Sequence, residues 1–272
     1  MTQAPGLQLR RLAGISSYFA VQDGPARTAD GWHPAASLLD EDGRLLGEAI
    51  DSIAARLAAP RRWIAASILF QGWASRLTSI YAGSLTLDGA APDLAITRVH
   101  YRVPPAGPVD MIIDPVVPLD ATRAWRRILD DHLHPLAGAF RAQARVGRRI
   151  LEGNIASSLS GSLGTLARTG HGSLAGLVAQ PWARPADLAA YGSWTQTPQG
   201  PRFARTTCCG YLRIPGGGPC GDCSLAALFP ALASARDSRC GVRGRVRYLG
   251  RYTEGLAVAE GQEEIRSRRF GY

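Results

Sequence analysis

The sequence contains no lysine, so each of its 31 basic residues is an arginine. Cysteine and methionine are also scarce, at five and two residues, and aromatic residues make up only 7% of the chain. No apolar run approaches the length of a bilayer-spanning helix, because the run Trp63–Phe70 soon meets Gln71 and Arg76. These absences exclude a membrane span by sequence and predict a soluble globular protein.

What the chain does contain is enough apolar material for a sizeable core. Its 272 residues are 46% hydrophobic, which suits one large domain or two modest ones. The formal net charge is +9. We interpret much of the arginine excess as the codon bias of a GC-rich genome, with attraction to anions, including the inner membrane face, as the alternative. No helix-turn-helix, RNA-binding or zinc-finger pattern is present, so we expect no nucleic-acid partner.

The N-terminal residues give only a faint indication of export. Arg10 and Arg11 precede a short apolar stretch, but Ser16 and Ser17 break it and no convincing cleavage site follows before Asp23. We therefore expect a cytoplasmic protein. In that compartment thiols stay reduced, and clustered cysteines are interpreted as metal ligands before disulfides.

Hydrophobic periodicity predicts an α+β fold that is predominantly helical, with a small antiparallel sheet around residues 85–114 and a compact C-terminal region. Two stretches alternate as strands do, 94–103 and 109–113, on either side of a proline-rich turn. Residues 203–214 also resemble a strand. We expect helices over residues 43–59, 61–80, 120–133 with a break or kink at Pro135, 147–168, 172–180 and from about Asp222 to Leu232.

Three domains or regions follow from these patterns. Residues 1–200 form a mixed, mainly helical scaffold and 201–235 a four-cysteine region. Residues 236–272 contain nine arginines and five acidic residues with little periodicity, which predicts a basic, disordered tail.

Four of the five cysteines lie within sixteen positions, in the pattern C-C-x10-C-x2-C. Four thiolates suit either a closed zinc site or an iron–sulfur cluster. A zinc ribbon generally has two C-x2-C knuckles, and only one is present here. Adjacent side chains diverge on an extended backbone, so a two-iron cluster, which is wider than one ion, accommodates the first pair more easily. This argument does not exclude a zinc site. The four residues are Cys208, Cys209, Cys220 and Cys223.

The residues around these cysteines suit an anionic site. Gly216, Gly217 and Gly218 would let backbone N–H groups approach cluster sulfurs, and the N-terminus of a following helix would add positive dipole. Arg205 and Arg213 flank the first pair, either as groups that tune a cluster or as solvated strand residues.

The stretch from Arg205 to Cys223 resembles the C-terminal signature of the FhuF family of siderophore-iron reductases, which has a Cys-Cys pair, a Tyr and an Arg, a Pro-Gly-Gly loop and Cys-Gly-x-Cys. Weaker similarity covers Ser67–Leu77 and Leu151–Leu159, although the family often has Trp where Glu152 stands. The resemblance implies that the four cysteines bind a [2Fe–2S] cluster. The residues that match the segment between them are Tyr211, Arg213, Pro215, Gly216 and Gly217. Candidates for cluster tuning or substrate contact are Arg205, Tyr211, Arg213, Gly216 and Gly217.

The same resemblance implies a ferric-siderophore reductase, an oxidoreductase that delivers one electron to Fe(III) and releases Fe(II). Its partners would be a ferric siderophore, mainly of the hydroxamate type, and an external electron donor such as a ferredoxin or a flavin reductase, since no dinucleotide fingerprint is visible. We expect the cleft for the siderophore beside Cys208 and Cys209, lined by the small residues of 151–166. The alternatives are a zinc-stabilised module that binds siderophore or a partner, and an iron–sulfur sensor.

We assign no functional role to two further features of the sequence. Cys240, in the tail, is expected to be a free thiol. His132 and His134 lie two positions apart, so on a helix they point in different directions and are expected to be a solvated face rather than a metal site.

Overall fold

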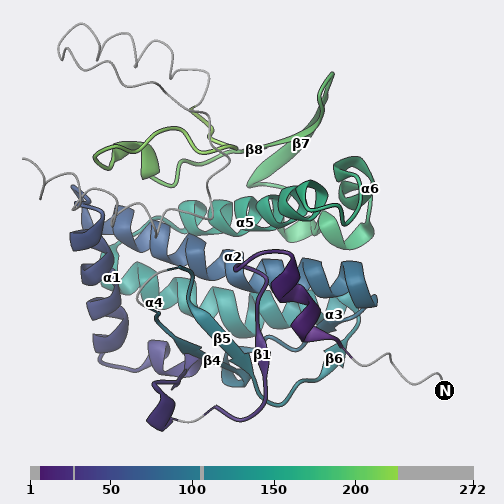
Figure 1. Cartoon of the computed structure of the whole chain (residues 1–272). Helices are drawn as coiled ribbons and strands as arrows, with labels where there is room; N and C mark the ends of the chain where they lie inside the picture. Colours follow the sequence, from purple (N-terminus) through teal and green to yellow (C-terminus); the bar gives the residue numbers. More distant parts are fainter. Residues whose placement is uncertain (1–6, 27, 105–106, 226–272) are drawn as a thin grey trace, which may run out of the picture.

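Two long helices, α2 (Arg62–Asp88) and α5 (Arg148–Arg168), pack side by side at the centre of the fold (Figure 1). The computed structural model describes residues 7–26, 28–104 and 107–225. It confirms the predominantly helical α+β class. The other α-helices are α1 (Arg44–Arg56), α3 (Ala121–Ile128), α4 (His134–Ala144) and α6 (Leu174–Val178). Helix α1 packs against α2 on the side away from α6 (Figure 1).

Helix α2 is buried on nearly all sides, as its sequence predicts, but it continues eight residues beyond the expected end at 80. The extension is buried because a 3₁₀ turn, η1 (Leu9–Gly14), and the residues after it pack on it. A Cβ at Gly83 would lie 2.7 Å from Leu12 and 2.8 Å from Phe19, so the absence of a side chain there permits this close packing. The helix ends at Gly89, which adopts a left-handed conformation with φ of 71°.

A four-stranded sheet with the order β1-β5-β4-β2 covers part of the helical layer. The predicted antiparallel pair is confirmed as β4 (Val99–Arg102) and β5 (Asp110–Ile113), with Tyr101 opposite Met111. The outer strands were not predicted: β2 (His33–Pro34) pairs antiparallel with β4, and β1 (Gln22–Asp23) pairs parallel with β5. A separate two-stranded pair joins β3 (Ala91–Pro92) to β6 (Pro118–Leu119).

The chain stays helical through Pro135, where the sequence predicts a break or kink. Helix α3 runs into a π-helical turn, η5 (Leu129–Leu133), and α4 starts directly afterwards with Pro135 in its first turn. Proline is tolerated in a first turn because the N–H it lacks has no helical partner there. His132 lies in the π-helical turn and is fully buried, so the expectation of a solvated face is wrong for this residue.

After α6 the chain forms short 3₁₀ turns, η6 (Pro181–Ala183) and η7 (Ala186–Leu188), and then an antiparallel hairpin that was not predicted. Its strands are β7 (Gly192–Thr197) and β8 (Gly200–Arg205), and the hairpin lies over α5 (Figure 1). The predicted strand 203–214 is therefore wrong beyond Arg205, because the chain turns into a loop that contains only the 3₁₀ turn η8 (Tyr211–Arg213). Two shorter 3₁₀ turns and a five-residue one complete the described elements: η2 (Thr28–Asp30), η4 (Ile96–Arg98) and η3 (Ala35–Leu39).

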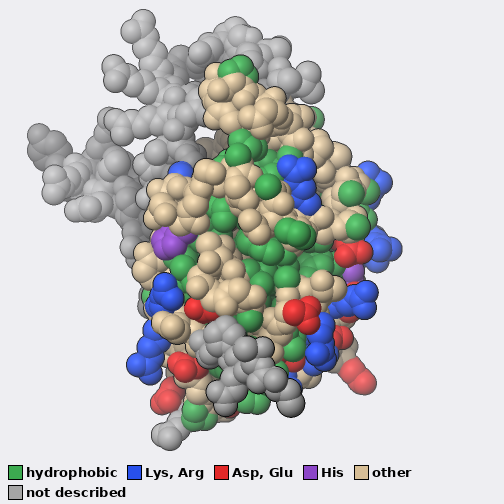
Figure 2. Space-filling model, turned by 90° about the vertical axis from the view of Figure 1, so that its right-hand side faces the viewer, with side chains coloured by type: hydrophobic (Ala, Val, Ile, Leu, Met, Phe, Trp, Pro, Cys, Tyr) green, Lys and Arg blue, Asp and Glu red, His purple; other side chains and the backbone are tan. Residues whose placement is uncertain are grey.

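One hydrophobic cluster runs from Leu9 to Leu188 and joins all of the helices and the sheet. Among the described residues, no helix combines the length and the apolar character needed to cross a bilayer. Figure 2 shows a face on which hydrophobic side chains gather in the middle, while basic and acidic side chains lie side by side toward its lower margin. The positive charge is thus not collected into a single patch on this face. The predicted tail 236–272 lies outside the described residues.

Candidate functional site

The cysteine loop, defined here as residues 206–225, follows β8 and rests on α5 and α2. Two glycines allow the close approach. A Cβ at Gly153 would lie 2.1 Å from Oγ1 of Thr207, whose hydroxyl donates to the carbonyl of Arg149 at 3.2 Å. Gly210 has φ of 89°, and a Cβ there would lie 3.0 Å from the Trp63 ring. The loop is also tied to the end of β8, because the Arg205 N–H donates to the carbonyl of Asp222 at 3.1 Å.

All four predicted cysteines of the loop are free thiols. Cys209 and Cys223 are buried, with 2% and 6% of their surface exposed, whereas Cys208 and Cys220 are partly exposed. The Cys220 thiol interacts with both Cys209 and Cys223 and so affects their pKa values. Cys208 interacts electrostatically with Cys220 and Cys223. Within the described parts of the chain, however, no three His, Cys, Asp or Glu side chains form a group that could hold a single metal ion.

Three of the four sulfur atoms accept a hydrogen bond from an N–H group. The backbone N–H of Gly210 donates to Cys208 at 3.3 Å and that of Leu225 to Cys223 at 3.4 Å. The backbone of Tyr211 lowers the pKa of Cys209. Cys220 accepts from the guanidinium of Arg205, with Nη2 3.6 Å from Sγ. Such donors stabilise the thiolate relative to the thiol, and the thiolate is the form that ligates metal.

Arg205 is the centre of a buried polar network that joins the cysteine loop to the two central helices. Its side chain has no exposed surface and forms an ion pair with Asp222. Nη1 donates to Oδ1 of Asn154 at 2.8 Å, and Nη2 donates to Oγ of Ser157 at 2.8 Å. Asn154 in turn donates to the carbonyl of Ser67 at 2.9 Å. A buried guanidinium with this many acceptors is stable because its charge is both paired and hydrogen-bonded.

The electrostatics of the thiols reflect two opposing effects. Burial is the largest influence on Cys208 and Cys223 and raises the pKa of each. The hydrogen bond between Cys220 and Cys209 lowers the pKa of Cys209 and raises the pKa of Cys220. The positive charge of Arg205 lowers the pKa of all four thiols. Arg205 is therefore the one side chain that favours the thiolate form at every position of the site.

The other predicted residues shape or flank the cysteine loop. The N–H of Gly217 donates to the carbonyl of Ile214, and a Cβ at Gly217 would lie 2.1 Å from the carbonyl oxygen of Tyr211. Gly216 has φ of 73°. These glycines thus shape the turn, and the observed N–H donors to sulfur come from elsewhere. Arg213 is exposed and lies over the Trp63 ring, with Cζ 5.7 Å from the ring centroid.

The helix expected from about Asp222 is not present in residues 221–225, which are turns, and its continuation lies outside the described residues. No helix dipole is therefore directed at the thiols by this part of the loop. Cys240 also lies outside the described residues.

Sequence reasoning did not identify the partners of Arg205. In the sequence Asp222 indicates only the start of a helix, and Asn154 and Ser157 stand out only as members of the segment Leu151–Leu159. The signal that could have found them is the weaker resemblance over Ser67–Leu77 and Leu151–Leu159, since these two segments supply the network on α2 and α5. Gln71, which donates to Ser157 at 3.1 Å, lies in the first of them.

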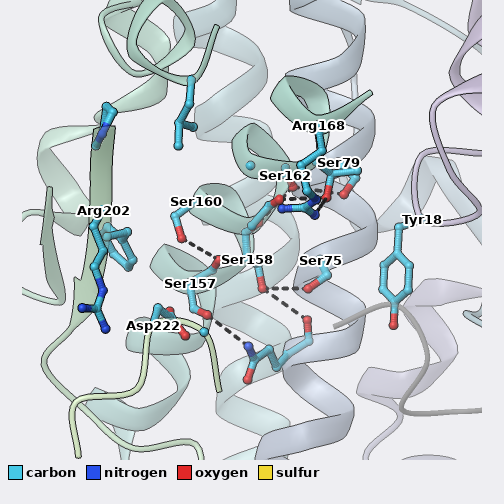
Figure 3. A pocket seen from close by; sticks show the side chains of 18 of the residues that line it. Tyr18, Ser75, Ser79, Ser157, Ser158, Ser160, Ser162, Arg168, Arg202 and Asp222 are labelled. Atoms are coloured by element: carbon cyan, nitrogen blue, oxygen red, sulfur yellow. Dashed lines mark hydrogen bonds between the residues drawn. The ribbon is translucent and has the colours of Figure 1, made fainter. Parts of the chain in front are cut away.

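A cavity of about 270 Å³ lies beside this network, between α2, α5, β8 and the cysteine loop (Figure 3). Its lining from the loop consists of Gly221 and Asp222, which lie between Cys220 and Cys223 in the sequence. No cysteine, and neither Arg205 nor Arg213, is among its lining residues in the described chain. Small residues of α5, including Ser157 and Ser158, also line this cavity.

The four thiols, with N–H donors to three of the sulfurs and a buried cation beside them, fit a group with soft metals and net negative charge. Zinc and iron–sulfur clusters are the two such groups with four thiolate ligands. No protein-family model matches the chain, and no curated protein matches it either.

Proposed function

We propose that the protein is a cytoplasmic ferric-siderophore reductase of the FhuF type, with a [2Fe–2S] cluster held by Cys208, Cys209, Cys220 and Cys223. The observation that carries the proposal is the set of N–H donors to three of the four sulfur atoms, beside a buried arginine that favours the thiolate form of all four. The family resemblance supports it through the spacing of the same four residues. Hydrogen bonds and positive charge around cluster sulfurs are established means of setting its reduction potential.

When bound, the cluster supplies a one-electron donor. The overall reaction takes one electron from an external reductant, such as a reduced ferredoxin or a flavin reductase, and converts the Fe(III) of the siderophore to Fe(II). Oxygen ligands hold Fe(II) far more weakly, so the iron leaves and the siderophore keeps its covalent structure. No proton transfer is needed from the protein. The chain's own residues bind the siderophore, exclude water and hold the thiolates in place.

Arg205 contributes in two ways to this role. Its charge favours the thiolate form of every cysteine. Its bonds to Asn154 and Ser157 fix the cysteine loop against α5, which limits the rearrangement that accompanies a change of charge.

One observation favours a second candidate, a zinc-stabilised binding module. The Cys223 N–H donates to the carbonyl of Cys220 at 3.0 Å, which gives the C-x2-C segment the tight turn of a metal knuckle. Such knuckles occur in zinc sites as well as in iron sites. The two candidates differ in metal content, colour and redox behaviour.

The test is metal and sulfide analysis of protein prepared without oxygen. We expect about two irons and two acid-labile sulfides per chain, visible absorption, and an EPR signal on one-electron reduction. Cys220→Ser should lose the cluster, and Cys240→Ser is the matched control that should keep it. Zinc at one ion per chain, or the absence of inorganic sulfide, would overturn the proposal.

A second measurement separates the reductase from an iron–sulfur sensor. The reduced protein is mixed with a ferric hydroxamate siderophore and a chromogenic chelator specific for Fe(II). The reductase should reoxidise and release one Fe(II) per cluster. A protein that contains the cluster and stays reduced in the presence of the siderophore would be a sensor.

A further inference from the structure

The cavity beside the cysteine loop has a lining unlike the apolar core around it. Hydroxyl groups of α2 and α5 form its floor, and aromatic rings of Phe19, Trp194 and Phe203 contribute to its walls. Figure 3 shows Tyr18 on one side and Arg202, on β8, on the other, with the serines of α5 between them. The hydroxyl-bearing residues are Ser75, Ser79, Ser157, Ser158, Ser160, Ser162 and Thr165.

Most of these hydroxyls are already paired. Ser158 bonds to Ser75 and to the carbonyl of Gln71, and Ser162 bonds to Ser79 and to the carbonyl of Ser158 (Figure 3). Together they stabilise the contact between α2 and α5, which explains their presence without a ligand.

Ser157 differs from the other serines. Its oxygen accepts from Nε2 of Gln71 at 3.1 Å and from Nη2 of Arg205 at 2.8 Å. The two contacting atoms, Nε2 of Gln71 and Nη2 of Arg205, both donate, and no hydrogen bond in the described part of the chain takes the hydroxyl proton of Ser157, which is 5% exposed. A buried hydroxyl that lines a cavity and lacks an acceptor is satisfied by an oxygen atom of a ligand or of water.

The charge around the cavity is positive. Arg168 and Arg202 both line it and are exposed, and neither has an ion-pair partner in the described part of the chain. Asp222 is the only acidic residue of the lining, and both of its carboxylate oxygens accept from Arg205. Its charge is therefore balanced inside the protein, which leaves the two arginines free to attract an anion.

The volume limits what can enter. At about 270 Å³ the cavity is slightly below the roughly 300–1,000 Å³ of sites that enclose drug-sized ligands. It suits a small chelate, whereas a large cyclic hydroxamate complex would extend well outside it. Arg205 links the cavity wall to the thiols, because the same Nη2 atom contacts Ser157 at 2.8 Å and Cys220 at 3.6 Å.

From these observations we infer that the cavity binds a small, anionic, oxygen-rich chelate of Fe(III), with carboxylate oxygens on Arg168 and Arg202 and an oxygen acceptor for Ser157. The inference rests on the proposed function for the identity of the metal. Among ferric complexes it favours small, carboxylate-bearing chelates over large hydroxamate siderophores, which the cavity would enclose only in part. The electron requirement is unchanged: one electron from the external reductant converts bound Fe(III) to Fe(II).

Binding can be measured separately from reduction with gallium(III), which has the charge of Fe(III) and is not reduced under these conditions. Isothermal titration calorimetry with gallium citrate on the full chain should show one site. Gallium ferrichrome, which is a neutral trihydroxamate complex, should bind about tenfold more weakly or not at all. Raising the ionic strength from about 0.05 M to about 0.5 M should weaken binding of the citrate complex, because the arginines are exposed.

Two sets of variants locate the site. Arg168→Gln and Arg202→Gln should each weaken gallium citrate binding by about threefold to tenfold, while Arg56→Gln, at the exposed end of α1, leaves it unchanged. Gly161→Trp should abolish binding by filling the cavity, because a Cβ at Gly161 meets no atom within 4 Å and the backbone need not move. Gly138→Trp, on exposed α4 with the same open surroundings, is its control.

The outcomes distinguish the two proposals. Full affinity in a Gly161→Trp protein that melts like the wild type would overturn the cavity site, as would a wild-type protein that binds neither gallium complex. Gallium citrate binding that Gly161→Trp removes, in a protein that holds a cluster and releases no Fe(II) from ferric citrate, would uphold the binding site and overturn the reductase.

Discussion

The guanidinium of Arg205 lies 3.6 Å from the sulfur of Cys220 although its side chain has no exposed surface. A charge in such a place is stable only because Asp222, Asn154 and Ser157 surround it with acceptors. The thiol site and the hydrophobic core are thereby joined through a single side chain. A substitution of Arg205 should therefore alter both the thiol site and the stability of the core.

Arg205→Gln should lower the free energy of unfolding by about 3–5 kcal/mol, because it leaves the buried carboxylate of Asp222 without a counter-charge. Urea denaturation of the metal-free protein measures the change. Arg213→Gln is the matched control and should alter stability by less than about 1 kcal/mol, since Arg213 is exposed. A stability loss for Arg205→Gln as small as that of the control would contradict the network described above.

Gly217→Ala should lower the amount of iron–sulfur cluster that the cysteine loop binds, whereas Gly218→Ala should not. A Cβ at Gly217 would lie 2.1 Å from a backbone oxygen, that of Tyr211, so the turn must open to accept it. A Cβ at Gly218 meets no atom within 4 Å. Iron and acid-labile sulfide per chain, measured after the same anaerobic preparation, provide the comparison. Equal loading of the two variants would show that the shape of this turn is irrelevant to the site.

Ser157→Ala should destabilise the protein by about 1–3 kcal/mol, because it removes the acceptor shared by Gln71 and Arg205. Ser160→Ala, three residues along α5, removes only a bond to the carbonyl of Ser157 in its own helix and should have little effect. Thermal unfolding of the two variants tests the difference. Equal melting temperatures would mean that the hydrogen bonds to Ser157 contribute little to the free energy of unfolding.

The stability of the fold should depend on pH through His132. Burial lowers its pKa from 6.5 to about 4, and the neutral ring accepts from Trp73 at 2.9 Å and donates to the carbonyl of Leu94 at 2.7 Å. Because the folded-state pKa is below the unfolded one, this stabilisation is complete above about pH 6.5. It is lost as the pH falls from about 6.5 toward 4, by up to about 3 kcal/mol.

His132→Gln provides the comparison for this pH dependence. Other groups titrate in the same range, so the quantity of interest is the difference between wild type and variant. That difference should shrink as the pH falls from about 6.5 to 4. A difference that stays constant over this range would mean that His132 is not neutral in the fold.

The helices could be predicted because their apolar periodicity is local. Helix α5 was predicted as 147–168 and observed as Arg148–Arg168. The two-residue strands β1 and β2 could not be predicted, because each is defined by its partner in the sheet rather than by alternation of its own. The predicted strand after Phe203 stops early because Arg205 turns inward to Asp222 and Gly210 takes a left-handed conformation.

The candidate site could likewise be predicted only in part. The cysteines lie close together in sequence, so their spacing alone indicated a metal site. The partners of Arg205 come from α5 and from the far end of the cysteine loop, and only the packing of α5 against β8 brings Asn154 to it. The direction in which a buried arginine turns is not encoded in its neighbours along the chain.

The packing of the N-terminal residues on α2 has a practical consequence for anyone producing the protein. Leu12 and Phe19 cover the Gly83 surface of the central helix, and Gln22 pairs with Ile112 in the sheet. A recombinant version trimmed to begin after Asp23 would expose that surface to water and remove an edge strand. Such a trimmed chain should aggregate during expression, and a purification tag is better attached ahead of Leu7 than substituted for the residues that follow it.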